Sequence, residues 1–259
     1  MSFLGFNAPV EHIGFIGNSN ALAEVISKST GKPTGGAFPL GNITSALIDI
    51  STEKVSMKDM GSGSMGTLLE HTVSTTMSVT LTLGSLSPEN IALGAYSDVI
   101  KDAAEVGKTF VGSAYRDRSI IPDGIIASVE SITGADAVEL VEGTDYIVSN
   151  GSIYFTPESA ITDGEEVQVS YTTVNTKRLE AMINSDLNLR IVFDGMNVSR
   201  GNAPVKVTLH NVAISPMTQR QLIGSDYGSI ELKGTLLLSR QAFGPGYSRY
   251  FKEEHADAI

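Results

Sequence analysis

The chain has 259 residues and a formal net charge of -11, with 29 Asp and Glu against 18 Lys and Arg, and it has no cysteine. The missing cysteines exclude disulfides, thiol nucleophiles and thiolate metal sites. The acidity, without any cluster of basic residues, argues against tight nucleic-acid binding, because Lys and Arg must replace the counterions of the phosphates. No segment approaches the roughly 20 apolar residues of a membrane span, and the first residues lack the pattern of a secretion signal. We therefore expect synthesis in the cytoplasm and no membrane insertion.

Residues 1–43 are rich in Gly, Asn, Ser and Pro and are predicted to form an N-terminal arm. Asn18 and Ser19 are placed to cap one short helix from Ala21 to Lys28. A strand follows at about 44–53, and apolar residues on both of its faces indicate burial on two sides.

Residues 54–70 are predicted to form a long mobile loop, because Gly61, Gly63 and Gly66 fall within six residues. Loops of this length in compact domains are usually functional or disordered, and methionine adapts well to a partner's surface. We predict that this loop becomes ordered on contact with a partner. Its predicted contact residues are Met57, Lys58, Asp59, Met60, Met65, Leu68 and Leu69.

Residues 73–83 alternate with a period of two, which only a pleated strand can turn into two distinct faces. One face is mostly apolar and consists of Val73, Thr75, Met77, Val79, Leu81 and Leu83. The other face carries hydroxyl groups and no charge, and consists of Ser74, Thr76, Ser78, Thr80 and Thr82. This hydroxyl face must meet water or another polar surface.

One helix is predicted next, with Ser87 as its N-cap and Pro88 at its first position, where the missing N–H costs nothing. An apolar stripe continues the pattern to about Glu105, and Gly107 is predicted to end the helix.

The rest of the chain reads as strands. In residues 110–174 the pair Asn150 and Gly151 predicts a hairpin with a type I′ turn, and a further strand is expected over 166–173. Strands are also expected at 187–194, 205–214 and 229–240. The predicted fold class is therefore mainly β, an antiparallel β-sandwich with one flanking α-helix and a small inserted β domain. The sandwich would comprise residues 44–109 and 175–259, and the inserted domain residues 110–174.

No residue pattern indicates catalysis. The glycines from Gly61 to Gly66 match the dinucleotide fingerprint formally, but a polar segment precedes them and a strand follows them, so the context is wrong. The four histidines, His12, His71, His210 and His255, are scattered and lack ligand spacing. We predict that the protein is not an enzyme and uses no cofactor or metal.

Three segments together resemble the tail tube proteins of long-tailed bacteriophages. These are the strand Ala46–Ile50 with Glu53, the glycine-rich stretch to Glu70, and the alternating strand that runs into Leu86-Ser87-Pro88-Glu89-Asn90-Ile91-Ala92-Leu93-Gly94. The segment Gly143-Thr144-Asp145-Tyr146 also resembles inserted β modules of phage tail proteins. The resemblance covers about 44–107 and 185–240.

This resemblance implies a structural virion protein of the phage tail that polymerises as stacked hexameric rings, and a tube through which DNA reaches the host without being bound specifically. The partners implied are other copies of the chain and the tail initiator, tape measure and terminator proteins. Residues 54–70 would bridge successive rings, and the hydroxyl face would line the lumen or an inter-subunit surface.

Two other classes of function remain open. A carbohydrate-binding or adhesin-like β module would explain the inserted domain and the tyrosines Tyr146, Tyr154 and Tyr171. A hydrolase on a β scaffold is the least supported class, because it requires His and carboxylate groups to lie together and no sequence pattern indicates this.

Overall fold

The computed structural model describes residues 15, 17–61, 63, 65–134, 138–184, 187–242 and 244–256. Its secondary structure is mainly antiparallel β, with a single α-helix among these residues. The chain divides into unit 1, Met1–Asp98 with Glu180–Ile259, and unit 2, Val99–Leu179. The inserted domain predicted at 110–174 lies within unit 2, which is longer at both ends.

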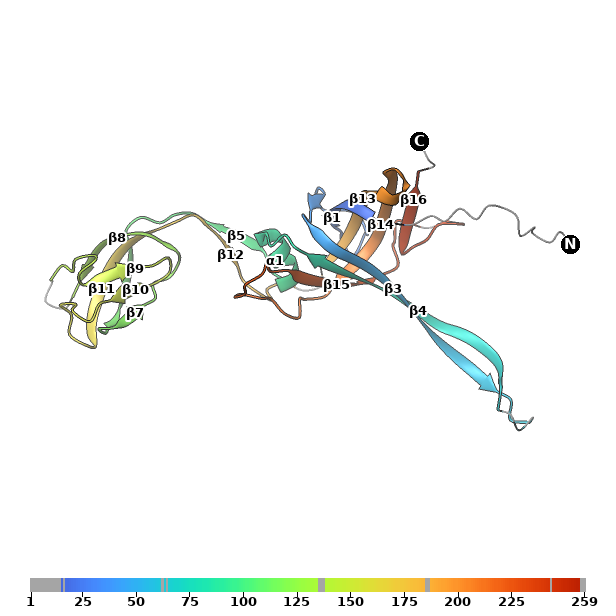
Figure 1. The fold of residues 1–259 in the computed structure, drawn as a ribbon, viewed down its shortest axis with the longest axis horizontal. Helices are drawn as coiled ribbons and strands as arrows, with labels where there is room; N and C mark the ends of the chain where they lie inside the picture. Colours follow the sequence, from blue (N-terminus) through green and yellow to red (C-terminus); the bar gives the residue numbers. More distant parts are fainter. Residues whose placement is uncertain are drawn as a thin grey trace. The chain divides into compact units, whose positions relative to one another are not determined.

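Unit 1 is built on one eight-stranded sheet with the order β2-β1-β13-β14-β15-β4-β3, and β16 also pairs with β14 (Figure 1). The strands are β1 (Gly17–Val25), β2 (Phe38–Pro39), β3 (Ile43–Lys58), β4 (Thr67–Leu83), β13 (Asn188–Asn197), β14 (Ala203–Ile214), β15 (Ile230–Leu236) and β16 (Phe251–His255). A short 3-10 turn, η1 (Val198–Arg200), connects β13 to β14. The strands expected at 187–194, 205–214 and 229–240 are confirmed with small shifts of their ends.

The sheet of unit 1 branches at β14, which changes neighbours along its length. Residues Val205–Leu209 pair with β16, whereas Val212–Ile214 pair with β15. The two halves of the sheet therefore face each other as a sandwich and share one core. That core contains Ala21, Ala23, Leu40, Val79, Leu81, Leu83, Leu93, Leu189, Ile191, Leu209, Val212, Ile214, Ile230, Leu232 and Leu236.

The helix expected at Ala21–Lys28 is wrong, because this segment lies largely in β1. Every residue of β1 pairs with β13, and Ala21 and Ala23 are buried in the core. Burial against β13 overrides the helix preference of alanine, which is only a weak prior. The predicted arm of residues 1–43 is therefore part of the sandwich from Gly17 onward, and residues 1–14 lie outside the described residues.

The predicted helix starts as expected but ends ten residues early. In α1 (Pro88–Ala95) the hydroxyl of Ser87 accepts a hydrogen bond from the Asn90 N–H, which confirms the N-cap. Tyr96 then adopts a left-handed conformation with φ 51°, and its N–H bonds the Ala92 carbonyl. The next residues form β5 (Val99–Asp102), which pairs with β12 (Thr176–Leu179). Gly107 does not end a helix but turns the chain with φ +68°.

The loop predicted at 54–70 is wrong as well, because most of it is a β-hairpin. β3 and β4 pair as far as Lys58 and Thr67, and the Asp59 N–H bonds the Gly66 carbonyl to close the turn. Cross-strand pairs therefore hold residues that the glycine content alone assigns to a loop.

Unit 2 contains two three-stranded sheets, β7-β10-β9 and β6-β11-β8, and the two-stranded ribbon β5–β12. Its strands are β6 (Lys108–Ala114), β7 (Arg118–Ile120), β8 (Ile126–Thr133), β9 (Tyr146–Val148), β10 (Ile153–Phe155) and β11 (Glu165–Thr173). They enclose a separate core of Ala114, Ile120, Ile126, Ile132, Leu140, Tyr146, Ile153, Phe155, Ile161, Val167, Val169 and Tyr171.

The hairpin around Asn150 and Gly151 is present, but its turn is not type I′, since neither residue has a positive φ. The Asn150 carbonyl accepts the N–H of Ile126 at the start of β8. This contact helps to hold the turn in a different conformation.

Candidate functional site

The second-longest strand of unit 1, β3, lies at an edge of its sheet. β3 has 16 residues and pairs with β4 on one side, and the described part of the sheet ends there. A long edge strand presents a row of unpaired N–H and C=O groups, which is a template for pairing with another chain. This edge is the first component of a candidate assembly surface.

The distal part of the β3–β4 hairpin leaves the sheet altogether. The last pair between β4 and β15 is Met77 with Leu236, so residues 54–73, here called the arm, form a two-stranded ribbon (Figure 1). A hairpin without a third strand is only marginally stable in water. The arm is therefore a structure that gains stability when another surface covers it.

A β-bulge at Val73 changes the character of the outer sheet face. On the sandwich side of the bulge Glu53 pairs with Ser74, and beyond it Lys54 pairs with Thr72, which leaves Val73 as the extra residue. Because paired residues share a face, the face that carries hydroxyls in the sandwich becomes apolar in the arm. A bulge also bends its strand and increases the twist, so Val73 sets the direction of the arm.

The arm has one apolar face and one polar face. The apolar face carries Val55 and the cross-strand pair Met57 and Leu69, with exposed fractions of 61%, 60% and 66%, and His71, the partner of Val55, is the one polar side chain beside them. On the polar face Lys54 Nζ lies 2.9 Å from Glu70 Oε1, and Lys58 Nζ donates to Thr67 Oγ1 at 2.8 Å. Exposed apolar side chains gathered on one face of a protruding hairpin mark an interaction site.

The contact residues predicted for segment 54–70 are distributed over this arm. Met57 and Lys58 end β3, Leu68 and Leu69 begin β4, and the other three lie in the turn. The apolar ones, Met57, Met60, Met65, Leu68 and Leu69, are all exposed. Lys58 belongs instead to the polar face, and Asp59 accepts the N–H of Gly61 within the turn.

The hydroxyl face lies on the outer side of the sheet. Ser74 and Thr76 are exposed, while Ser78, Thr80 and Thr82 are half-buried. By register, Asp49 of β3 and Glu231 and Lys233 of β15 lie beside these hydroxyls, and Ser74 donates to Glu53. The face is thus mainly polar, with more acidic than basic groups, and it also carries the exposed Leu47 beside Thr80.

An apolar cleft of about 530 Å³ opens between the two layers of unit 1. One wall comes from β3 and β4 and the other from β13 and β14. The apolar residues that line it are Phe15, Ile43, Ala46, Ile48, Val79, Phe193, Met196, Val205 and Val207. The sequence pattern did not predict this cleft, because its walls come from strands far apart in the chain.

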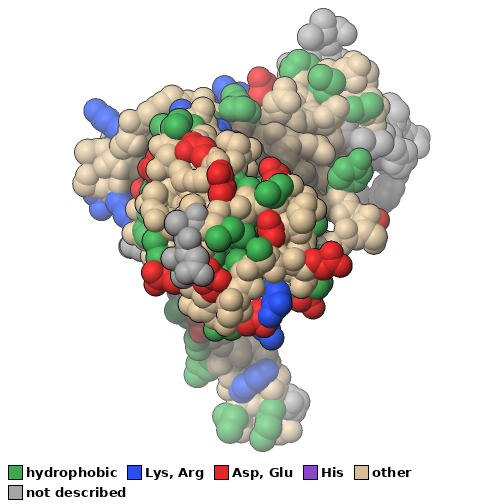
Figure 2. Space-filling view, turned by 90° about the vertical axis from the view of Figure 1, so that its left-hand side faces the viewer, with side chains coloured by type: hydrophobic (Ala, Val, Ile, Leu, Met, Phe, Trp, Pro, Cys, Tyr) green, Lys and Arg blue, Asp and Glu red, His purple; other side chains and the backbone are tan. Residues whose placement is uncertain are grey.

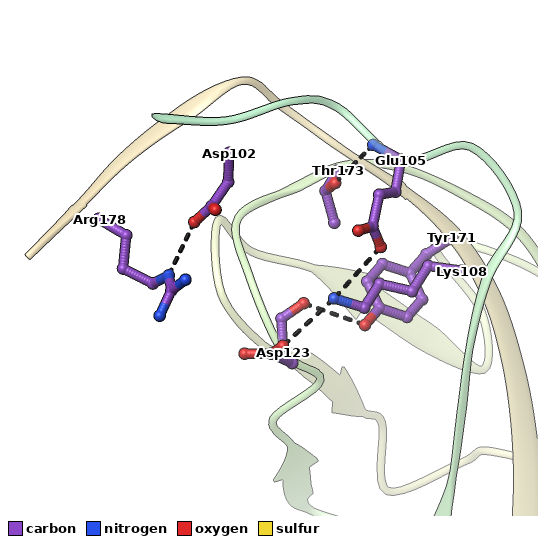
Figure 3. A network of polar contacts seen from close by, with 7 residues as sticks. All are labelled: Asp102, Glu105, Lys108, Asp123, Tyr171, Thr173 and Arg178. Atoms are coloured by element: carbon purple, nitrogen blue, oxygen red, sulfur yellow. Dashed lines mark hydrogen bonds and ion pairs between the residues drawn. The ribbon is translucent and has the colours of Figure 1, made fainter. Parts of the chain in front are cut away.

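Unit 2 has a polar cavity of about 520 Å³ near the ribbon β5–β12 (Figure 3). Lys108 Nζ lies 3.2 Å from Asp123 Oδ2 and 3.5 Å from Glu105 Oε2. Arg178 Nε donates to Asp102 Oδ2 at 2.8 Å. The cations and carboxylates balance, so this cavity has no net charge that would select a charged ligand.

The ion pairs of this network shift two pKa values in the directions expected for structural salt bridges. The hydrogen bond from Arg178 lowers the pKa of the Asp102 carboxyl, and the hydrogen bond to Asp123 raises the pKa of Lys108. Each partner stabilises the charged form of the other. Because all of these groups are engaged with one another, we assign the network a structural role.

The exposed end of unit 2 shows acidic and hydrophobic side chains together, with basic ones sparser (Figure 2). Of the three tyrosines considered for carbohydrate binding, Tyr146 and Tyr171 are buried in the core. The third, Tyr154, donates its hydroxyl to Asp117 at 2.6 Å. These tyrosines therefore do not form a common stacking platform for sugars.

The histidines do not converge on a site. His71 lies in the arm, His210 on β14, and His255 beside Glu253 on β16, whereas His12 lies outside the described residues. Burial, aided by the charges of Arg190 and Lys252, lowers the pKa of His210. Among the described residues no three His, Asp or Glu side chains are grouped so that they could hold a metal ion, and no helix is long and apolar enough to cross a membrane.

The chain belongs to the family described as "Protein of unknown function UCP028589", whose model it matches over residues 21–254. The match therefore includes the second part of β1, the arm, all of unit 2 and most of unit 1. No curated protein matches the chain.

Proposed function

We propose that this protein is a structural virion component that polymerises as stacked hexameric rings into the tail tube of a long-tailed bacteriophage. It would act without enzymatic activity or cofactor, and the tube would conduct DNA into the host. Its partners would be further copies of the chain and the initiator, tape measure and terminator proteins of the tail.

The hairpin arm is the observation that carries this proposal. Val55, Met57 and Leu69 are each about three-fifths exposed on one face of a ribbon that has no third strand. An isolated subunit gains nothing from exposing these side chains, whereas a polymer can bury them at every subunit contact. The arm corresponds to the segment that the resemblance assigns to contacts between successive rings.

The edge of β3 supports contacts within a ring. Its unpaired backbone groups would pair with an edge strand of the adjacent copy and continue the sheet across the subunit boundary. A contact between two different edges is heterologous, and such contacts close into rings when the rotation between copies allows it. The number six is taken from the resemblance.

The hydroxyl face supports a role as the lining of the lumen. Its hydroxyls, together with Asp49, Glu53 and Glu231, would present DNA with a hydrated and weakly repulsive wall. DNA could slide along such a wall, because it offers few cations for the phosphates to bind.

Negative-stain microscopy and sedimentation of the purified protein test this proposal. The sharpest variant replaces residues 54–73 with Asn-Gly, so that a two-residue turn joins the paired residues Glu53 and Ser74. We expect the full chain to form tubes and this variant to fold but to form no species larger than single rings. Normal tubes from the armless variant, or a full chain that stays monomeric at high concentration and in the presence of a tail initiator complex, would refute the proposal.

A further inference from the structure

We propose that the apolar cleft of unit 1 is the receptor for the arm of a second copy of this chain, and this inference rests on the proposed function. The cleft and the apolar face of the arm would be the two halves of one repeating contact. The inference adds a specific acceptor surface, with its residues, to the proposed polymer.

The two surfaces match in chemistry and size. The lining of the cleft is mainly apolar and includes Ile48 of β3 and Phe193 and Met196 of β13, with a polar minority of Asn18, Ser19, Thr44, Ser45 and Glu253. The arm presents Val55, Met57 and Leu69 on its apolar face. A cleft of about 530 Å³ has room for several aliphatic side chains of this kind.

The arm of the same copy cannot fill the cleft. Residues Ile43–Ile48 form part of the cleft wall, and the arm begins only a few residues later on the same strand. To fold back into the cleft, β3 would have to break its pairs with β4 between Asp49 and Glu53. An arm that occupies the cleft must therefore come from another copy.

Backbone groups can support this docking in addition to the side chains. The free edge of β3 runs along the cleft, and β4 has a second free edge from Thr67 to Thr76, where β15 no longer accompanies it. An incoming arm could thus pair with the first part of the β3 edge, beside the cleft, while its apolar face enters the cleft, as in β-augmentation, and the rest of that edge would stay available to the adjacent copy within a ring. The polar face, with the Lys54 and Glu70 pair, would remain in water.

Cysteine cross-linking between two variants tests this arrangement, and the chain suits it because it has no cysteine of its own. Leu69→Cys labels the apolar face of the arm, Met196→Cys labels the cleft, and Ser56→Cys on the polar face is the matched control. All three positions are exposed or half-buried, so each variant should keep the melting temperature of the unmodified chain. A disulfide forms only when the two Cα atoms come within about 7 Å and the Cβ vectors converge.

We expect tubes assembled from equal amounts of Leu69→Cys and Met196→Cys to give a mixed cross-linked dimer on oxidation, several-fold more than tubes that contain Ser56→Cys and Met196→Cys. Tubes without the first cross-link would overturn this inference and leave the proposed function standing, whereas the absence of tubes would refute the proposed function itself. The inference also fails if Leu69→Cys cross-links only to itself, or if Met196→Cys is captured by a cysteine placed at Phe6 of the same chain.

Discussion

The apolar face of the arm offers the most direct test of how assembly is driven. We predict that the combined substitution Val55→Thr, Met57→Thr and Leu69→Thr abolishes polymerisation at concentrations where the unmodified chain assembles. Full burial of one such side chain contributes about 1.5 to 3 kcal/mol. Because about three-fifths of each is exposed, covering all three contributes ~3 to 5 kcal/mol per contact. Threonine keeps a high strand propensity but removes most of this gain.

At 1.4 kcal/mol per tenfold change, the critical concentration for assembly should rise ~100- to 4,000-fold. Pelleting at a series of concentrations measures this value, and negative-stain microscopy identifies the product. Thermal unfolding of the monomer should hardly change, since surface substitutions usually alter stability by no more than about 0.5 kcal/mol. The matched control, Ser56→Thr with Thr72→Ser on the polar face, should assemble normally. Assembly of the triple variant at the normal concentration would show that the apolar face does not drive polymerisation.

Three further predictions concern the subunit itself. Leu81→Ala removes a fully buried side chain from unit 1 and should lower the free energy of unfolding by about 2 to 5 kcal/mol. In calorimetry the melting temperature of unit 1 should fall and that of unit 2 should not. An equal shift of both would contradict two separate cores. Ser87→Ala removes the N-cap of α1 and should cost roughly 1 kcal/mol in urea unfolding, while Ser87→Asp should retain most of the stability. The lowered pKa of His210 means that folding favours its neutral form, so the stability it contributes should be present above about pH 6.5 and be lost as the pH falls through the folded-state pKa. His210→Gln should flatten that part of the stability–pH curve, and an unchanged curve would exclude His210 as its cause.

Local sequence patterns were sufficient to predict the elements that depend little on pairing with distant strands. The alternation of residues 73–83 correctly predicted a strand, because period two is a property of the pleated backbone itself. Of its predicted apolar face, Val79, Leu81 and Leu83 are buried, whereas Val73 is exposed at the bulge. Ser87 and Pro88 marked the start of α1, since capping depends on only the first turn. The sequence pattern also predicted correctly that the inserted segment consists mainly of β-strands.

Long-range pairing decided the elements that sequence reasoning missed. Residues 17–25 form a strand because β13 lies beside them, and residues 99–102 pair with β12 instead of extending the helix. The glycine-rich segment 54–70 is ordered as an arm by cross-strand pairs, although its composition is that of a loop. The partners of residues 17–25 and 99–102 are distant in sequence, so no local pattern could identify them.

The sequence by itself determined that the protein is β-rich and acidic, that it has no cysteine, and that it carries a strand face of hydroxyl groups and a methionine-containing segment before that strand. Only the tertiary structure decided that this segment is an amphipathic arm, that a bulge at Val73 orients it, and that an apolar cleft lies open in the same unit. The physical reason is that composition and periodicity follow from neighbouring residues, whereas edges, bulges and clefts arise where distant strands meet or fail to meet.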